Sequence, residues 1–403
     1  MNSAKKIIKN QGVSTERKDK KQEPVVSIKN KVLLAIGLLI MVVLVGGVCY
    51  VQLRPRPVLK VEGKNASGST VTNTVNYKEA MYDICSTENQ YNSMESLYTQ
   101  FYGSSYWEAQ NLDSSGRNGS QLAKKEIMKT MKQREILYME ATKANMTLSD
   151  DEKSKVSEDV KTFRDGLTST QKKLSGLDEK TVTKVLEKQA LADKYKEKVI
   201  ADLGIDEEAL KATVKKEDYR QYTLQYYTIT KNKVDKDGNE VTDDDGNKTK
   251  KSDEELKKAK SDMEALRKKA AAAEDFSKNV ITDSNNDSKD DSTGISYATE
   301  DLIETDTDFM SEDARKTVKA MKNDQISDVI ETNDAFYVVK MVNNNDPKAY
   351  DEQCKTVVEE EKESQFNTKY KDDIKPNYTA TAQSFWKSRV KIGYITYDDS
   401  EEE

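Results

Sequence analysis

The sequence contains no histidine, which excludes catalytic triads that use histidine and metal sites with histidine ligands. Glycine and proline are scarce, at 16 and 5 of 403 residues, which argues against a disordered Pro/Gly-rich chain and against a sandwich with many turns. Only three cysteines are present. Cys49 lies in a hydrophobic run, and we expect Cys85 and Cys354 to be free thiols rather than a disulfide.

Hydrophobic residues make up only 35% of the chain, whereas charged residues make up 34%. Long solvated helices around a limited core account for both figures, and the length suggests two or three domains. Residues 1–31 carry nine Lys or Arg and three acidic residues, a net charge of +6. Because the whole chain has a net charge of −7, the remaining residues carry −13. An acidic body lacks the basic face that nucleic-acid binding requires, and we predict no nucleic-acid partner.

An uncharged run of 20 residues, 32–51, is the strongest hydrophobic signal in the chain. At about 1.5 Å rise per residue, a helix of this length spans about 30 Å, the hydrocarbon thickness of a bilayer. A cleaved signal peptide has a shorter apolar core, and a lipoprotein signal has Leu where this chain has Gly46, so we predict an uncleaved single-pass signal anchor. The basic cytoplasmic tail, residues 1–31, predicts an N-terminus inside and a body outside the cytoplasm, with the lipid bilayer as a partner.

A helical region is predicted from residue 76 to residue 218, after a polar linker at 52–75. The apolar spacing from Tyr82 to Phe101 predicts its first helix. Ser149 and Glu152 form a capping box, and Gly176 and Gly204, each followed two residues later by Asp, predict helix ends and new N-caps.

Most apolar stripes of this region are predicted to be core. We predict that its exposed aromatic residues form a helical cradle for unfolded chains; these residues are Tyr98, Tyr102, Tyr106 and Trp107.

The middle of the chain, residues 219–345, predicts the order strand, helix, strand, helix, strand. The strands are expected at 222–229, 292–297 and 336–341, and the helices at 253–280 and 311–321. The insertion 231–251 contains Asp-Gly pairs, but their spacing does not meet that of a calcium-binding EF-hand. Tight turns explain these pairs better, and we predict no metal and no cofactor.

The C-terminal segment, residues 346–403, predicts a charged helix at 350–375 and ends in an acidic tail. Between them lies a compact apolar cluster, which we expect to pack against the N-terminal helices; its members are Phe385, Trp386, Val390 and Ile392. The predicted fold is therefore mostly α, with an inserted α+β domain and a helical body formed by the N- and C-terminal segments.

Several motifs of the middle region resemble those of parvulin-type peptidyl-prolyl isomerase domains. Lys322-Asn-Asp-Gln-Ile-Ser327 is similar to the family's Lys-x-Gly-Glu-Ile-Ser, and Thr332 and the strand from Ala335 follow as in the family. Asp275-Phe276 matches the Asp-Phe that closes the family's first helix. With helical segments on both sides and a membrane anchor in front, the layout resembles the PrsA and SurA class of extracytoplasmic foldases.

The resemblance implies a set of site residues. Tyr226 and Tyr337 stand at the family's two histidine positions, and Ser284, with Asp283 beside it, at its reactive Cys/Asp position. These four are the predicted catalytic residues. The predicted substrate-binding residues are Met310 at the pocket Met, Ala314 at the pocket Phe, Tyr297 at an aromatic position of the second strand, and Phe336 beside Tyr337.

Three functions remain open at this stage. The main hypothesis is a membrane-anchored extracytoplasmic foldase or holdase that binds unfolded or proline-containing polypeptides, with the parvulin-like domain as a peptide-binding module. The second is an active prolyl isomerase with atypical site residues, because isomerisation requires enclosure of a twisted amide and no nucleophile or metal. The third is a non-catalytic adaptor bound to one envelope partner.

Overall fold

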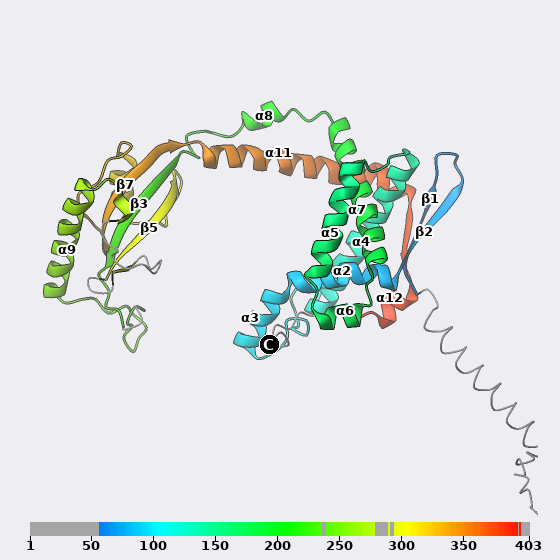
Figure 1. Ribbon diagram of the computed structural model, residues 1–403, viewed down its shortest axis with the longest axis horizontal. Helices are drawn as coiled ribbons and strands as arrows, with labels where there is room; N and C mark the ends of the chain where they lie inside the picture. The colour runs from blue at the N-terminus through cyan, green and yellow to red at the C-terminus, as the bar shows by residue number, and fades with distance from the viewer. Residues whose placement is uncertain (1–55, 236–238, 279–288, 291–293, 394, 396–403) are drawn as a thin grey trace, which may run out of the picture.

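The computed structural model describes residues 56–235, 239–278, 289–290, 294–393 and 395. They form a helical body and an α+β unit, which the long helix α11 (Lys348–Lys369) connects (Figure 1). The first and last described segments of the chain both contribute to the body, and the middle forms the α+β unit, as predicted. The predicted membrane span, 32–51, lies outside the described residues, and no described helix is long and apolar enough to cross a membrane.

The body is mainly α-helical. Besides α11, its helices are α2 (Tyr77–Gln90), α3 (Asn92–Tyr102), α4 (Gly119–Lys143), α5 (Asp150–Asp165), α6 (Ser169–Ser175), α7 (Glu179–Asp202), α8 (Glu207–Lys211) and α12 (Ser384–Arg389). After α11 the chain continues as a π-helical turn, Tyr370–Ile374, and a 3-10 turn, Lys375–Asn377. The predicted charged helix at 350–375 therefore corresponds to α11 with this irregular end.

A three-stranded antiparallel sheet in the order β2-β1-β8 belongs to the body. Its strands are β1 (Pro57–Lys64), β2 (Thr70–Asn76) and β8 (Thr379–Ala382). The prediction of a linker at 52–75 is therefore wrong from residue 57 onward. The Ser-Gly-Ser stretch that suggested a loose chain forms the tip of the β1–β2 hairpin, and Val58, Leu59 and Val61 are fully buried.

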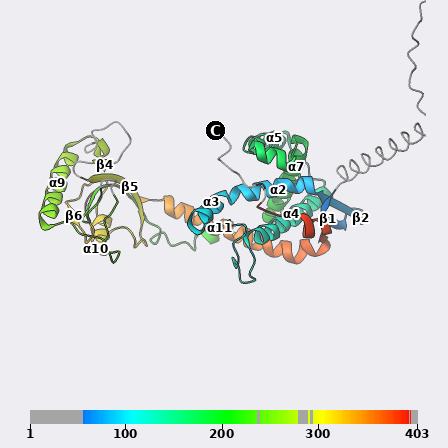
Figure 2. The same cartoon turned by 90° about the horizontal axis from the view of Figure 1, so that it is seen from below.

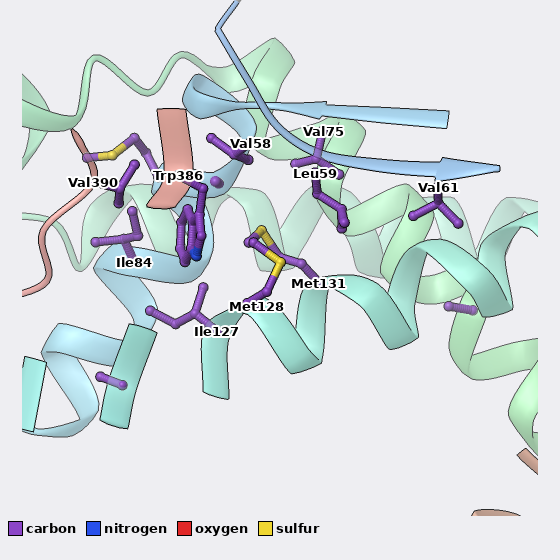
Figure 3. Packing of buried hydrophobic residues seen from close by; sticks show 14 of the residues in the cluster. Val58, Leu59, Val61, Val75, Ile84, Ile127, Met128, Met131, Trp386 and Val390 are labelled. Atoms are coloured by element: carbon purple, nitrogen blue, oxygen red, sulfur yellow. The ribbon is translucent and has the colours of Figure 1, made fainter. Parts of the chain in front are cut away.

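The core of the body lies between this sheet and α4. Figure 3 shows its apolar side chains in contact, among them Val58, Leu59, Val61, Ile127, Met128 and Met131. Trp386, Val390 and Ile392 belong to the same cluster, so the C-terminal segment packs against the N-terminal helices as predicted. Val156 and Val160 of α5 pack against Val182 of α7 in a smaller second cluster.

The predicted helix from Tyr82 to Phe101 is two helices, α2 and α3, which meet at Tyr91. The Tyr91 amide donates to the carbonyls of Thr87 and Glu88, and its ring contacts the Tyr106 ring. Tyr91 itself leaves the helical conformation at this junction, with φ −92° and ψ 3°.

The predicted helix starts are confirmed. Ser149 and Glu152 form the capping box of α5, and the side chains of Asp178 and Asp206 cap α7 and α8. The described cysteines, Cys85 and Cys354, are both free and buried, as expected. Burial raises the pKa of Cys85 to about 12.

The α+β unit has the predicted order of strand, helix, strand, helix, strand. These elements are β3 (Gln221–Thr230), α9 (Asp253–Ala272), β5 (Ile295–Ile303), α10 (Glu312–Lys319) and β7 (Ala335–Asp346). Short strands β4 (Lys289–Asp290) and β6 (Ile330–Glu331) complete an antiparallel sheet in the order β4-β5-β3-β7-β6. One face of the sheet packs against α9 and the other against α10.

Two details of this unit concern the predictions. Helix α9 ends at Ala272 rather than at residue 280, and the chain continues into a short 3-10 turn with Phe276 buried. In the insertion before α9, the Asp243 carboxylate accepts hydrogen bonds from the amides of Asp245 and Asn247. This contact confirms the tight turn predicted at that Asp-Gly pair.

Candidate peptide-binding site

Tyr226 and Tyr337 lie on neighbouring strands and on the same face of the sheet, the face that packs against α10. Antiparallel pairing sets Tyr226 opposite Val339 and Thr228 opposite Tyr337, and residues opposite each other share a face. The two rings are half-buried, with centroids 6.0 Å apart. The structure thus brings together the two tyrosines that were predicted to stand at the family's histidine positions.

Phe309 completes this group from the loop before α10. Its ring centroid lies 5.2 Å from that of Tyr226 and 6.2 Å from that of Tyr337. We call Tyr226, Phe309 and Tyr337 the aromatic trio. All three side chains are half-buried, so the trio offers apolar ring surface that is still partly open to solvent.

Met310 lies beside the trio in a strained backbone conformation. Its φ is 58°, a left-handed value that residues other than glycine seldom adopt. The Arg315 guanidinium donates to the carbonyls of Phe309 at 3.1 Å and Met310 at 2.6 Å, and this contact holds the loop in place. Ala314, predicted to stand at the position of the family's pocket Phe, is buried in α10 one turn from the core residue Val318.

Both tyrosines of the trio are protonated at neutral pH, since a phenol ordinarily has a pKa of about 10 and the pKa of each is raised further. Burial is the main cause that raises the pKa of Tyr226, with the nearby Glu300 carboxylate adding to it. Burial also raises the pKa of Tyr337, although a hydrogen bond with the Thr228 side chain partly offsets it. Neutral phenols can both donate and accept hydrogen bonds, so the trio combines apolar faces with two polar tips.

Two of the predicted substrate-binding residues do not belong to this group. Phe336 is 2% exposed and Tyr297 is half-buried, and both pack in the cluster under α9 on the opposite face of the sheet. Because side chains alternate along a strand, Phe336 must point away from its neighbour Tyr337. The structure therefore does not bring these two residues together with Met310. Asp283 and Ser284 lie outside the described residues.

Phe309 is the residue that sequence reasoning missed. Phe309 directly precedes Met310 in the sequence. This position next to a predicted pocket residue is the only feature of the sequence that could have identified Phe309 as part of the site. The direction of its side chain depends on the left-handed turn at Met310 and on Arg315, five residues further on.

Residues 244–343 match the family model of the PPIC-type PPIase domain, also called rotamase. The chain carries a parvulin-type domain. The match confirms the predicted resemblance for this region and includes Phe309, Met310 and Tyr337. Strand β3, which carries Tyr226, precedes the matched residues but lies in the middle of the same sheet. No curated protein matches the chain.

Similar solved structures include several PrsA proteins. The foldase PrsA of Streptococcus pneumoniae is 20% identical, with 61% of this chain and 80% of that one covered and a TM-score of 0.22. PrsA of Lactococcus lactis is 15% identical, with coverages of 65% and 85% and a TM-score of 0.29. PrsA of Bacillus anthracis is 16% identical, with coverages of 59% and 87% and a TM-score of 0.19. TM-scores of this size do not establish a shared arrangement of the whole chain.

A second candidate surface lies outside the parvulin-type domain, on α3. None of its residues is buried, and its apolar side chains face solvent; the most exposed are Met94, Leu97, Phe101 and Tyr102. Of the predicted cradle aromatics, Tyr102 is 73% exposed and Tyr98 and Tyr106 are half-buried. Trp107 is only 4% exposed, so the prediction that it faces solvent is wrong.

The half-buried tyrosines connect this exposed face to the body. The Tyr98 ring contacts those of Tyr102 and Tyr106, at 5.1 and 5.4 Å between centroids. Tyr106 in turn stacks on Tyr91 at the junction of α2 and α3. We define the α3 face as the four exposed residues Met94, Leu97, Phe101 and Tyr102. Ring contacts through Tyr98 and Tyr106 connect this apolar surface to the body.

Proposed function

We propose that the chain is a membrane-anchored extracytoplasmic foldase that binds unfolded, proline-containing polypeptides. The observation that carries this proposal is the half-buried aromatic trio on a parvulin-type domain. The uncharged run 32–51 would provide the membrane anchor, with the basic residues 1–31 inside the cytoplasm. Digestion of intact cells by added protease tests this orientation, which requires that the body is cut and the N-terminal tail is protected.

The trio suits a peptide that contains proline for a physical reason. A proline ring is a rigid apolar group, and ring faces at 5–6 Å spacing provide contact area without ordering flexible side chains. The neutral hydroxyl groups of Tyr226 and Tyr337 are available to hydrogen-bond peptide groups beside the proline. Binding at the trio therefore needs neither a charged ligand nor a metal.

Prolyl isomerisation at the same site is the second candidate function. The barrier to rotation about a peptide bond is about 18–20 kcal/mol, and an isomerase lowers it by binding the twisted amide better than either planar form. The observation that favours this function is the strained loop at Met310, since such strain is concentrated at functional sites. Arg315 would keep Met310 in position against the twisted bond.

We expect Phe309→Ala to weaken the binding of a proline-containing peptide to the full chain by about 2- to 13-fold. The reason is the loss of one aromatic contact, worth about 0.5–1.5 kcal/mol. Fluorescence anisotropy of a labelled peptide measures the change. Tyr297→Phe is the matched control, because Tyr297 lies on the opposite face of the sheet and its replacement should leave the affinity unchanged. Equal affinities for Phe309→Ala and the unchanged chain would place the binding site elsewhere.

The same variants separate binding from catalysis. In refolding of a model protein limited by a proline, a foldase without isomerase activity suppresses aggregation and leaves the slow phase unchanged. An isomerase shortens the slow phase, and Met310→Ala or Tyr337→Phe should abolish that acceleration. Circular dichroism of each variant verifies that the domain has folded.

The α3 face is the second part of the proposed polypeptide-binding surface. We expect Phe101→Ser combined with Tyr102→Ser to reduce suppression of client aggregation at least severalfold. Both side chains are more than 70% exposed, so the free energy of unfolding should change by less than about 0.5 kcal/mol. Light scattering of an aggregating client measures the effect. Gln100→Ser, at an exposed polar position of the same helix, is the control, and a double variant that protects as well as the unchanged chain contradicts this role.

A further inference from the structure

Glu300 is a charged residue on the same face of the sheet as the aromatic trio. It lies on β5, and β4 is the one described strand beyond β5 on that side of the sheet (Figure 2). Antiparallel pairing sets Leu224 opposite Glu300 and Tyr226 opposite Ala298. Because residues opposite each other share a face, Glu300 and Ala298 lie on the face that carries the trio.

The Glu300 carboxylate lies within reach of a peptide bound at the trio. Diagonal neighbours on adjacent antiparallel strands lie about 7–8 Å apart, and Glu300 is a diagonal neighbour of Tyr226. The contribution of the Glu300 charge to the raised pKa of Tyr226 agrees with this proximity. Ala298, directly opposite Tyr226, has only a methyl group as its side chain. A long side chain of a peptide can therefore extend from the Tyr226 ring to the carboxylate.

Neighbouring acidic residues have partners within the chain. Asp301, on the opposite face of β5, accepts a hydrogen bond from the Thr223 hydroxyl group at 2.9 Å. Glu304 accepts one from the Tyr222 hydroxyl group at 2.6 Å. Glu300, in contrast, forms no side-chain hydrogen bond and no ion pair with a residue that the structure describes. Its half-buried carboxylate is therefore available to pair with a ligand.

Arg315 is the cation that holds the loop of the trio, and it does not neutralise this carboxylate by contact. Its guanidinium donates to the main-chain carbonyls of Thr307, Phe309 and Met310. No carboxylate of the described part of the chain lies within 4 Å of Arg315. The loop therefore leaves Glu300 without a positive partner.

A peptide that covers the trio would change the surroundings of Glu300. The carboxylate is already half-buried, and a bound peptide would remove more of its water. Burial of an unpaired charge is costly, whereas a partner of opposite charge offsets much of this cost. A Lys or Arg of the peptide would supply that partner, with its aliphatic part against the Tyr226 ring. An Asp or Glu of the peptide would be repelled.

We propose that Glu300 is the specificity-determining residue of the trio site and selects polypeptides in which a Lys or Arg directly precedes or follows the proline. The geometry sets this spacing, because one residue of extended chain spans about 3.3–3.6 Å and the basic side chain covers the remaining distance. The proposal rests on the proposed function: the trio binds the proline ring, and Glu300 selects among segments that contain proline.

Fluorescence anisotropy of two sets of labelled peptides with the full chain tests the proposal. Each set carries Lys, norleucine or Glu at one position, which directly precedes the proline in one set and directly follows it in the other. In at least one set, we expect the Lys peptide to bind about 3- to 10-fold more tightly than the norleucine peptide, and the Glu peptide to bind more weakly. Glu300→Gln should remove both differences, and Glu300→Lys should reverse them.

Asp301→Asn is the matched control, because it removes a carboxylate from the opposite face of the same strand. It should leave the preference for Lys unchanged. Circular dichroism verifies that each variant has folded. If Glu300→Gln does not fold, Glu300→Thr replaces it, since threonine is favoured in strands.

The outcomes separate the role of Glu300 from the function on which it rests. Norleucine peptides that bind, and that Phe309→Ala weakens, together with no preference for Lys would overturn the role of Glu300 and leave polypeptide binding at the trio intact. A preference for Lys that persists in Glu300→Gln would also overturn this role. If none of the proline-containing peptides binds, the proposed function fails and the role of Glu300 fails with it.

Discussion

Arg134→Met is expected to lower the free energy of unfolding of the helical body by about 3–5 kcal/mol, the cost of leaving a buried charge without its partner. The guanidinium of Arg134, on α4, donates to both carboxylate oxygens of Asp83, on α2, at 2.7 and 2.8 Å. Both side chains are less than 10% exposed. Methionine retains much of the volume, so the main loss is the cation that the buried Asp83 carboxylate requires.

The environment of Arg134 keeps it charged. Burial alone lowers the pKa of Arg134, but the carboxylates of Asp83 and Glu135 raise it by more, so that it lies above its ordinary value. Glu135 in turn bonds Lys188 of α7 at 2.8 Å, and Lys188 lies 3.6 Å from Glu79 of α2. This buried network connects three helices, and the loss of Arg134 should therefore loosen the packing of α2 on α4.

Tryptophan fluorescence during urea unfolding measures this effect on the body alone. The chain has two tryptophans, Trp107 and Trp386, and both are buried in the core of the body. Lys198→Met is a control for the loss of an exposed ion pair, the pair with Asp202, and should cost less than about 1 kcal/mol. Arg134→Met combined with Asp83→Leu should recover much of the stability, because no unpaired charge remains. An Arg134→Met chain as stable as the Lys198→Met chain would contradict the argument.

The network also illustrates what the sequence could not predict. Charged residues on amphipathic helices usually face solvent, and nothing in the local pattern of α4 sets Arg134 and Glu135 apart from its exposed lysines. Their burial depends on partners on α2 and α7. Strand β1 was missed for a similar reason, since it pairs with β8 from the far end of the chain, and this contact is not visible in local spacing.

The parvulin-type domain was more predictable because its signals are local. Alternating apolar residues and helix caps predicted its strands and helices, and the resemblance brought Tyr226 and Tyr337 to the same site. Strand alternation by itself would have placed Phe336 on the opposite face from Tyr337. The position of Phe309, in contrast, follows from a left-handed backbone at Met310 that Arg315 maintains, and such a conformation has no simple signature at a methionine.

Gly393→Ala is expected to destabilise the body by about 2–5 kcal/mol, for two reasons that add together. Gly393 has a φ of +89°, where a side chain costs about 1–2 kcal/mol. A Cβ atom there would also lie 2.4 Å from Cγ of the buried Trp107, and overpacking of a core costs about 1–3 kcal/mol. Circular dichroism during urea unfolding measures the change without relying on Trp107, which the substitution touches.

Two other glycines separate these contributions. Gly68 has a φ of +80°, and no atom of the described residues lies within 4 Å of the position a Cβ would take, so Gly68→Ala should show the backbone cost alone. Gly63 has no left-handed backbone, but its Cβ would lie 2.3 Å from the Tyr378 ring, so Gly63→Ala should show the steric cost alone. Gly393→Ala should lower the free energy of unfolding by more than either of these variants. If it lowers the free energy of unfolding by no more than Gly68→Ala does, Trp107 moves aside without cost.

The effect of Gly393 should reach beyond its own contact, because the neighbouring backbone fastens the C-terminal segment to the body. The buried Glu88 carboxylate accepts hydrogen bonds from the amides of Gly393 at 2.6 Å and Ile395 at 2.7 Å. A side chain that pushes residue 393 away from Trp107 would stretch both bonds. We therefore expect limited proteolysis to release the C-terminus of Gly393→Ala under conditions in which the Gly68→Ala chain stays intact.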